Sequence, residues 1–180
     1  MTTHYVPLGS GSPDYATIQA AVYACGTNDI INITDSSVYN ETVSGFPATG
    51  ITIQAIGGTP IIDGINKTGH VISSDKNGTQ LYGLTIRNGT DDGINLLGNS
   101  CEIKKCISHN NYSDGIQITG NTNIIQNNVC LHNGHFGEHG IDVDGNSNTI
   151  QYNKAYYNLA DGINIYGDAN TIANNQCCNN

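Results

Sequence analysis

Short segments of alternating hydrophobic and polar residues recur along the second half of the chain at nearly constant spacing. Each begins with glycine and continues as Ile-x-Ile or a close variant. The four copies start 22, 25 and 22 residues apart, at Gly93, Gly115, Gly140 and Gly162. Alternation with a period of two predicts β-strands whose first and third side chains point to one face. The repeat predicts a solenoid with about 22 residues per coil.

Aligning the copies places apolar side chains in three files, with one residue from each coil. The files are Ile94, Ile116, Ile141 and Ile163; Leu96, Ile118, Val143 and Ile165; and Ile103, Ile125, Ile150 and Ile172. Parallel strands stack about 4.8 Å apart, so each coil buries its inward face only against its neighbours. A coil of this length suits three short strands joined by turns. The expected fold is therefore all-β, a single-stranded right-handed parallel β-helix.

Asparagine recurs at fixed positions of the coils. Two columns are Asn111, Asn133, Asn158 and Asn180, and Asn123, Asn148 and Asn170. Asparagine tolerates the left-handed conformation of turns and bonds its local backbone, and stacked identical amides also bond along a ladder. We predict that these columns are structural turn ladders.

A capping helix is expected before the coils. Residues 14–26 show helical spacing of apolar residues and close with a glycine, with Asp14 or Ser12 as the expected N-cap. Such a helix would cover the open first coil. The expected organisation is one domain over residues 1–180, comprising the capping helix (14–26), irregular early coils (29–92) and regular 22-residue coils (93–180).

These segments resemble a known superfamily. Residues 14–21 (DYATIQAA), 29–33 (DIINI) and 39–43 (YNETV) resemble the N-terminal cap and first coil of pectate-lyase-like β-helix proteins. The later repeats are similar to NosD-type repeats, the carbohydrate-binding and sugar-hydrolase group. The resemblance covers nearly the whole chain and implies the fold. It implies no single activity, because the same repeat occurs in lyases, hydrolases, epimerases and inert surface proteins.

Composition narrows the choice of partner. The chain contains 25 Asn and six Lys plus Arg, and its formal net charge is −9. A nucleic-acid-binding protein would carry a basic patch, so no nucleic acid is expected. No apolar run approaches the roughly 18 residues of a membrane span. An anionic polysaccharide would be repelled unless a divalent cation such as calcium bridged the charges.

Localisation is inferred from glycosylation motifs. The first residues show no signal-peptide pattern. Six N-x-Ser/Thr sequons begin at Asn32, Asn40, Asn66, Asn77, Asn88 and Asn111. An Asn-rich chain also forms such sequons by chance, but they favour a secreted or cell-surface protein.

Acidic residues beside the repeats are candidates for catalysis. The resemblance implies that hydrolases of this fold use clustered aspartates, one as acid and others to activate water. The candidate catalytic residues are Asp114, His139, Asp142, Asp144 and Asp161. The competing interpretation is that Asp-Gly is ordinary turn chemistry, since these acids are spread evenly over the coils. The six Lys and Arg residues show no adjacent acidic pair of the kind the resemblance implies for a lyase.

The one 25-residue coil carries candidate metal ligands. Three His and one Glu fall within eight residues, at His132, His135, Glu138 and His139. Insertions in solenoids map to loops on one face, which often carries the function. Imidazoles at this density are suited to zinc or copper. A solvated polar loop is the competing interpretation.

Two outward tyrosines are candidates for binding carbohydrate. Alternation places Tyr152 and Tyr166 on the outer surface of the coils. Exposed aromatic rings can stack on the apolar faces of sugars. Tyrosine is also an ordinary strand-forming residue, so the assignment stays open.

The cysteines are expected to form no disulfides within the chain. Cys130 and Cys177 share a column but lie two coils apart, about 9.6 Å, whereas a disulfide needs Cα atoms within about 7 Å. Cys177 and Cys178 lie in the last coil, whose exposed strand edges are expected to pair with a strand of another chain. We predict an intermolecular disulfide there, with end-to-end stacking into a homo-oligomer or fibre.

Two functions remain. The first is a non-catalytic secreted or cell-surface scaffold that binds a polysaccharide or glycan surface and self-associates through its last coil. The alternative is a polysaccharide-active enzyme, a glycoside hydrolase or lyase-like protein or a fragment of one, with its site around residues 132–144. No cofactor is firmly indicated beyond a divalent metal such as calcium, zinc or copper.

Overall fold

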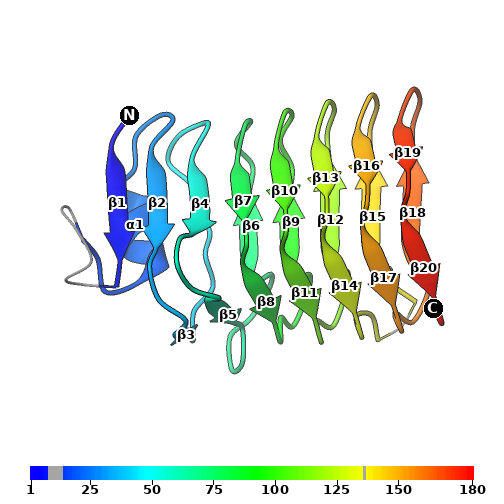
Figure 1. The fold of residues 1–180 in the computed structure, drawn as a ribbon, viewed down its shortest axis with the longest axis horizontal. Coiled ribbons are helices and arrows are strands. Elements are labelled where there is room, and N and C mark those ends of the chain that lie inside the picture. Colours follow the sequence, from blue (N-terminus) through cyan, green and yellow to red (C-terminus); the bar gives the residue numbers. More distant parts are fainter. Residues whose placement is uncertain (8–13, 136) are drawn as a thin grey trace.

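The chain folds into a parallel β-helix built from three sheets (Figure 1). The computed structural model describes residues 1–7, 14–135 and 137–180. The sheets contain eight, seven and five strands, and neighbouring strands in each are parallel. The predicted all-β parallel solenoid is confirmed.

The sheets are named here A, B and C. Sheet A contains β1 (Thr3–Val6), β2 (Ile30–Ile33), β4 (Thr52–Ala55), β7 (Gln80–Tyr82), β10 (Glu102–Lys104), β13 (Ile124–Gln126), β16 (Thr149–Gln151) and β19 (Thr171–Ala173). Sheet B contains β3 (Val38–Tyr39), β5 (Ile61–Asp63), β8 (Thr85–Arg87), β11 (Ile107–His109), β14 (Val129–Leu131), β17 (Lys154–Tyr156) and β20 (Gln176–Cys178). Sheet C contains β6 (Ile72–Ser74), β9 (Ile94–Leu96), β12 (Ile116–Thr119), β15 (Ile141–Asp144) and β18 (Ile163–Tyr166).

The three apolar files form the core in the predicted register. In sheet C, Ile116 pairs with Ile94 on one side and with Ile141 on the other. All three are fully buried. In sheet A the file ends at Ile172, which is 57% exposed because β19 has a neighbour on one side only. Burial of these files is the main source of stability, since each coil is too thin to form a core alone.

The asparagine columns form hydrogen-bonded ladders at the corners between sheets. Asn128, which is fully buried, accepts the backbone N–H of Cys106 through Oδ1 at 2.9 Å and donates from Nδ2 to the Ile103 carbonyl at 2.8 Å. Its own backbone N–H donates to the Asn153 side chain at 2.9 Å. Each rung thereby satisfies backbone groups that the chain exposes as it turns a corner.

The left-handed turn residue is the one before each buried asparagine, which corrects the expected assignment. Asn127 has φ 58° and Asn110 has φ 57°, whereas Asn128 and Asn111 are not in the left-handed region. A single left-handed residue bends the chain at the corner, and the next side chain then points inward. Asparagine is therefore selected at the second position for its hydrogen bonds rather than for its φ angle.

The capping helix is shorter than expected. Helix α1 covers Ile18–Ala24 and its N-cap is Thr17, whose side chain accepts the N–H of Ala20. The prediction that Asp14 caps the helix is wrong, because Asp14 instead forms a bridge to Tyr5. Ser12, the other candidate, lies outside the described residues. As expected for a cap, α1 packs beside β1 and β2 at the first coil (Figure 1).

A side chain from the next coil completes the helix N-terminus. The Glu41 carboxylate accepts the N–H of Ile18 at 3.0 Å and of Gln19 at 2.9 Å. A negative charge is favourable at this end of a helix, where backbone N–H groups lack partners within the helix. Among the described residues, no helix is long and apolar enough to cross a membrane.

The three-residue insertion lies at the corner between sheets B and C, called here the B–C corner. Nine residues, 132–140, connect β14 to β15, whereas six, 110–115, connect β11 to β12. This connection is the longest in the regular coils.

Candidate functional site

A groove runs along the B–C corner. One hollow, of about 480 Å³, is lined in part by Ile65, Asn66, Asn88, Thr90, Tyr112 and His135. A second, of about 430 Å³, is lined in part by Tyr157, Leu159 and Asn179. His132 and Gly134 line both, so the two hollows are adjacent. We call this surface the corner groove.

Two pairs of stacked rings lie in the corner groove. Tyr112 stacks on His135 with ring centroids 4.7 Å apart and planes inclined by 28°. His132 stacks on Tyr157 with centroids 5.3 Å apart and planes inclined by 10°. Tyr112 is 46% exposed and Tyr157 55% exposed, so both pairs face solvent while partly shielding one another.

One of these pairs is carried by left-handed corner residues. His132 and Tyr157 have φ 54° and 55°, in a column where Asn88, Asn110 and Asn179 occupy the same left-handed conformation. Corner residues elsewhere in the solenoid share it, among them Thr122 and Tyr152 with φ 59° and 58°. The conformation therefore positions these two rings at the corner but does not distinguish them from other corner residues.

A column of acidic and imidazole side chains lies beside sheet C. The register aligns His70, Asp92, Asp114, His139 and Asp161, each two residues before the first residue of a strand of sheet C. The Asp92 carboxylate accepts the backbone N–H of Asp114 at 3.0 Å and lies 3.0 Å from Nδ1 of His70. Asp92 is 2% exposed and Asp114 5% exposed.

The environments of these two carboxyl groups move their pKa values apart. Burial, together with the charges of Asp92, Asp142 and Glu138, raises the pKa of Asp114 to about 7, against the backbone hydrogen bond from His139. Burial also acts on Asp92, but hydrogen bonds led by His70 hold its pKa below the ordinary value. A neutral acid beside an ionised one is the usual arrangement of an acid–base pair.

The remaining candidate catalytic residues do not converge on this pair. Nδ1 of His139 accepts the backbone N–H of Asp161 at 3.2 Å, and the Asp161 carboxylate, 74% exposed, lies 3.7 Å from that nitrogen. Asp142 accepts a hydrogen bond from Asn164 at 2.9 Å. Asp144 is exposed and lies opposite Tyr166 in the register. Of the five, Asp142 contributes to the Asp114 environment through its charge, and His139 through its backbone N–H.

The candidate catalytic residues named from the sequence did not include two members of the column, His70 and Asp92. Their signal was the 22-residue spacing itself, since His70 precedes Val71-Ile72 as Asp92 precedes Gly93-Ile94. The replacement of glycine by Val71 hides this copy of the repeat.

Comparisons with known proteins agree with the β-helix fold. The family model described as "Right handed beta helix region" matches residues 20–177. The chain belongs to this right-handed β-helix family. Two solved structures share the predicted parallel β-helix fold. No curated protein matches the chain in sequence.

Both solved structures share the fold at low sequence identity. Pectate lyase Pel9A has a TM-score of 0.72 and 16% identity, covering 91% of this chain and 50% of its own. The pectin methylesterase from Aspergillus niger has a TM-score of 0.51 and 12% identity, covering 99% of this chain and 85% of its own. The present chain thus spans about half the length of the pectate lyase. Likeness at these identities establishes the fold alone.

The candidate metal ligands of this β-helix lie in separate contacts. His132 and His135 stack on different tyrosines, while His139 contacts Asp161. Among the described residues, these three and Glu138 do not bring three ligand atoms within 4.8 Å of one another. Two other groups do so: His4, Cys25 and Asp29, and His70, Asp91 and Asp92.

The two outward tyrosines are exposed, as are two of the cysteines. Tyr152 is 49% exposed and follows β16, while Tyr166 is 62% exposed and ends β18, so they lie on different faces. All six cysteines are free, and four of them are buried. Cys177 and Cys178 are exposed.

Proposed function

We propose that this β-helix protein is a non-catalytic, secreted or cell-surface protein that binds a polysaccharide or glycan through the corner groove. The observation that carries the proposal is the alignment of two exposed ring pairs, Tyr112–His135 and His132–Tyr157, along one groove. Aromatic rings pack against the apolar faces of sugars. The flanking asparagine amides can donate to and accept from sugar hydroxyls.

The shape of the corner groove favours an extended ligand. Its lining residues follow six neighbouring strands of sheet B, from β5 to β20. Five strand spacings of about 4.8 Å make a length of about 24 Å. A polymer lying parallel to the solenoid axis would meet the same corner of successive coils.

Charge favours a neutral glycan. The residues that line the two hollows include no Lys or Arg, and the chain carries a formal net charge of −9. A polyanionic glycan would therefore find no partner charges and a repulsive field. Of the six sequon residues, Asn40, Asn66 and Asn77 are exposed, as glycosylation requires, whereas Asn32 and Asn111 are buried.

Glycoside hydrolysis is the second candidate, and the pKa difference between Asp92 and Asp114 favours it. Against it, both carboxyl groups are almost completely buried, and the Asp92 oxygens accept hydrogen bonds from His70, Asn95 and the Asp114 backbone. A catalytic carboxyl must contact its substrate. We therefore rank binding above hydrolysis.

A glycan panel tests the proposal. Wild-type protein should be retained on one or more neutral glycans, and no new reducing ends should form during long incubation. Retention should fall in Tyr112→Ala and persist in Tyr152→Ala, a matched change of an equally exposed tyrosine on another face. Absence of binding to every glycan would contradict the proposal. New reducing ends formed by wild type but not by Asp114→Asn would establish the hydrolase instead.

We further propose self-association through the last coil, supported by the exposure of Ile172 and of the free thiols of Cys177 and Cys178. Oxidised protein should run as a dimer or larger species on a non-reducing gel and as a monomer after reduction. The double variant Cys177→Ser/Cys178→Ser should remain monomeric in both. A monomer band for oxidised wild type would show the covalent link to be wrong.

A further inference from the structure

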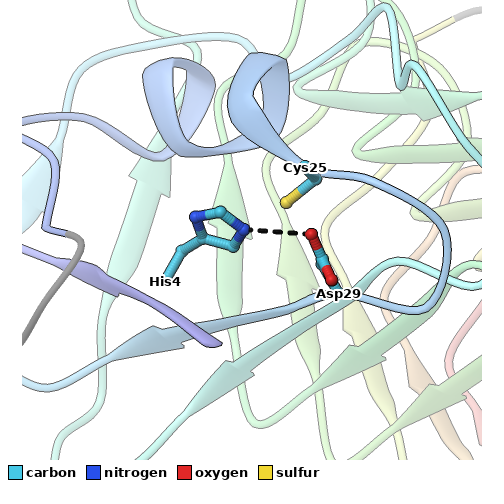
Figure 2. A group of neighbouring side chains, drawn as sticks. All are labelled: His4, Cys25 and Asp29. Atoms are coloured by element: carbon cyan, nitrogen blue, oxygen red, sulfur yellow. Dashed lines mark hydrogen bonds and ion pairs between the residues drawn. The ribbon is translucent and has the colours of Figure 1, made fainter. Parts of the chain in front are cut away.

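Three residues with metal-binding side chains meet inside the N-terminal cap. His4 lies in β1, Cys25 is the C-cap of α1, and Asp29 immediately precedes β2. Figure 2 shows the three side chains pointing toward one another. One ligand atom from each lies within 4.8 Å of the other two. We call these residues the cap cluster.

The cap cluster is enclosed by the protein. His4 is 3% exposed, Cys25 7% and Asp29 6%. A buried imidazole, thiol and carboxylate are unusual neighbours in an apolar cap, because burial of a charged or polar group costs free energy unless it is paired. The cluster also joins three chain segments that no disulfide holds together.

The hydrogen bonds already present leave the cluster incomplete. Nε2 of His4 contacts Oδ2 of Asp29 at 3.2 Å (Figure 2). The other ring nitrogen, Nδ1, is buried without a hydrogen-bond partner among the described residues. Nδ1 lies on the side of the ring away from Asp29 (Figure 2), so it can carry the ring proton while Nε2 remains open to a metal.

The geometry suits one metal in particular. Two ligand atoms that lie about 2.0 Å from a tetrahedral zinc ion are about 3.3 Å apart, close to the separation of His4 Nε2 and Asp29 Oδ2. Imidazole nitrogen, thiolate sulfur and carboxylate oxygen are the three ligand types that zinc takes from proteins. Calcium and magnesium take oxygen ligands and would not select this set.

We propose that His4, Cys25 and Asp29 form a zinc site that fastens β1 and the end of α1 to β2. Zinc binds Nε2 of His4 in the tautomer that carries its ring proton on Nδ1, together with Oδ2 of Asp29, and the Cys25 thiol releases its proton to solvent as the thiolate forms. The backbone N–H groups of Gly26 and Thr2 donate to the Asp29 carboxylate and hold it in place. One coordination position is left for a water molecule.

This site is independent of the corner groove. It lies at the first coil, whereas the lining of the groove begins at Ile65. Its role is structural: binding to the folded cap alone stabilises the fold by mass action. At a hundredfold excess of zinc over Kd, the melting temperature should rise by about 5 to 10 °C.

Cobalt(II) spectroscopy of the full-length protein tests the site directly. Cobalt occupies zinc sites, and a cobalt–thiolate bond gives an intense near-ultraviolet charge-transfer band. We expect this band to saturate at one cobalt per chain, to vanish in Cys25→Ser and to persist in Cys178→Ser, the matched change of an exposed thiol. Zinc should compete the cobalt away, whereas magnesium should not.

Two results would overturn the proposal. The first is a wild-type protein with no charge-transfer band, a result that needs no variant to fold. The second is a band that persists in Cys25→Ser or disappears in Cys178→Ser. Melting provides a separate readout: if the cap cluster is only a buried ion pair beside a thiol, zinc will shift wild type and Cys25→Ser equally.

Discussion

At the scale of single residues, stacking of the coils changes the chemistry of a common turn residue. Asp114 belongs to an Asp-Gly turn, a combination that occurs at three of the four regular coils. Its burial beneath the neighbouring coils, with Asp92 and Asp142 close by, raises its pKa to about 7. The protonation of Asp114 therefore makes the free energy of unfolding depend on pH.

Asp114→Asn should flatten that dependence. The folded protein retains a proton on Asp114 that the unfolded chain releases above about pH 4, so the wild-type free energy of unfolding falls as pH rises from 3.8 to about 7. The variant lacks this loss while keeping an oxygen to accept the His139 N–H. We expect the free energies of unfolding of the two proteins to diverge by about 3–4 kcal/mol between pH 4 and pH 7.5.

Urea denaturation at several pH values measures this difference. Asp144→Asn, which changes an exposed carboxylate in the same sheet, is the control. The raised pKa of His70 acts with the same sign, since its stabilisation is lost as pH rises through the folded value. That contribution is common to all three proteins and cancels in the comparison. If the free energy of unfolding changes with pH equally in wild type and Asp114→Asn, the pKa of Asp114 is not raised.

Asp114 was foreseeable from the sequence as a candidate, but its environment was not. The repeat places it in a column before each glycine, which the spacing alone reveals. That Asp92 rather than Asp144 or Asp161 acts on Asp114 depends on which side chains each coil buries. An exposed Asp161 and a buried Asp92 occupy the same register position and cannot be distinguished by pattern.

At the scale of elements, the ladders at the corners stabilise the fold alongside the apolar files. Asn128 satisfies the Cys106 N–H and the Ile103 carbonyl, neither of which has access to water. By contrast, Asn121 belongs to an exposed ladder and accepts the Asn146 N–H at 2.7 Å. Water can replace that contact.

Alanine substitutions should therefore differ sharply between the two ladders. Asn128→Ala leaves buried backbone groups unpaired and should lower the free energy of unfolding by about 2–4 kcal/mol. Asn121→Ala should lower it by less than about 1 kcal/mol. Midpoints of urea denaturation give both values. Similar losses in the two variants would show that the buried ladder has no special role.

Most elements were predictable because their signal is local and periodic. The isoleucine files occupy the predicted register. A period of two fixes the face to which each side chain points, and the constant repeat fixes which residues pair between coils. Strand β1 was missed because Thr3–Val6 is a single short segment separated from the repeats by α1. Asp14 was predicted as the N-cap, but the negative charge at the helix N-terminus comes from Glu41, which is distant in sequence and therefore not apparent from the local pattern.

At the scale of the whole molecule, the fold follows from the repeat but the corner groove does not. Its rings come from three successive coils, and their stacking depends on the left-handed corner residues and on the insertion after β14. The sequence drew attention to His132 and His135 as metal ligands. The structure stacks the same rings on tyrosines, along the surface that we propose binds a glycan.

Titration calorimetry tests the groove most directly, using the shortest fragment of whichever glycan wild type retains. Loss of one ring contact worth about 1.5 kcal/mol should weaken binding by about tenfold in Tyr112→Ala. Tyr152→Ala should bind as wild type does. If Tyr112→Ala retains wild-type affinity while Tyr152→Ala loses it, the corner groove is not the binding site.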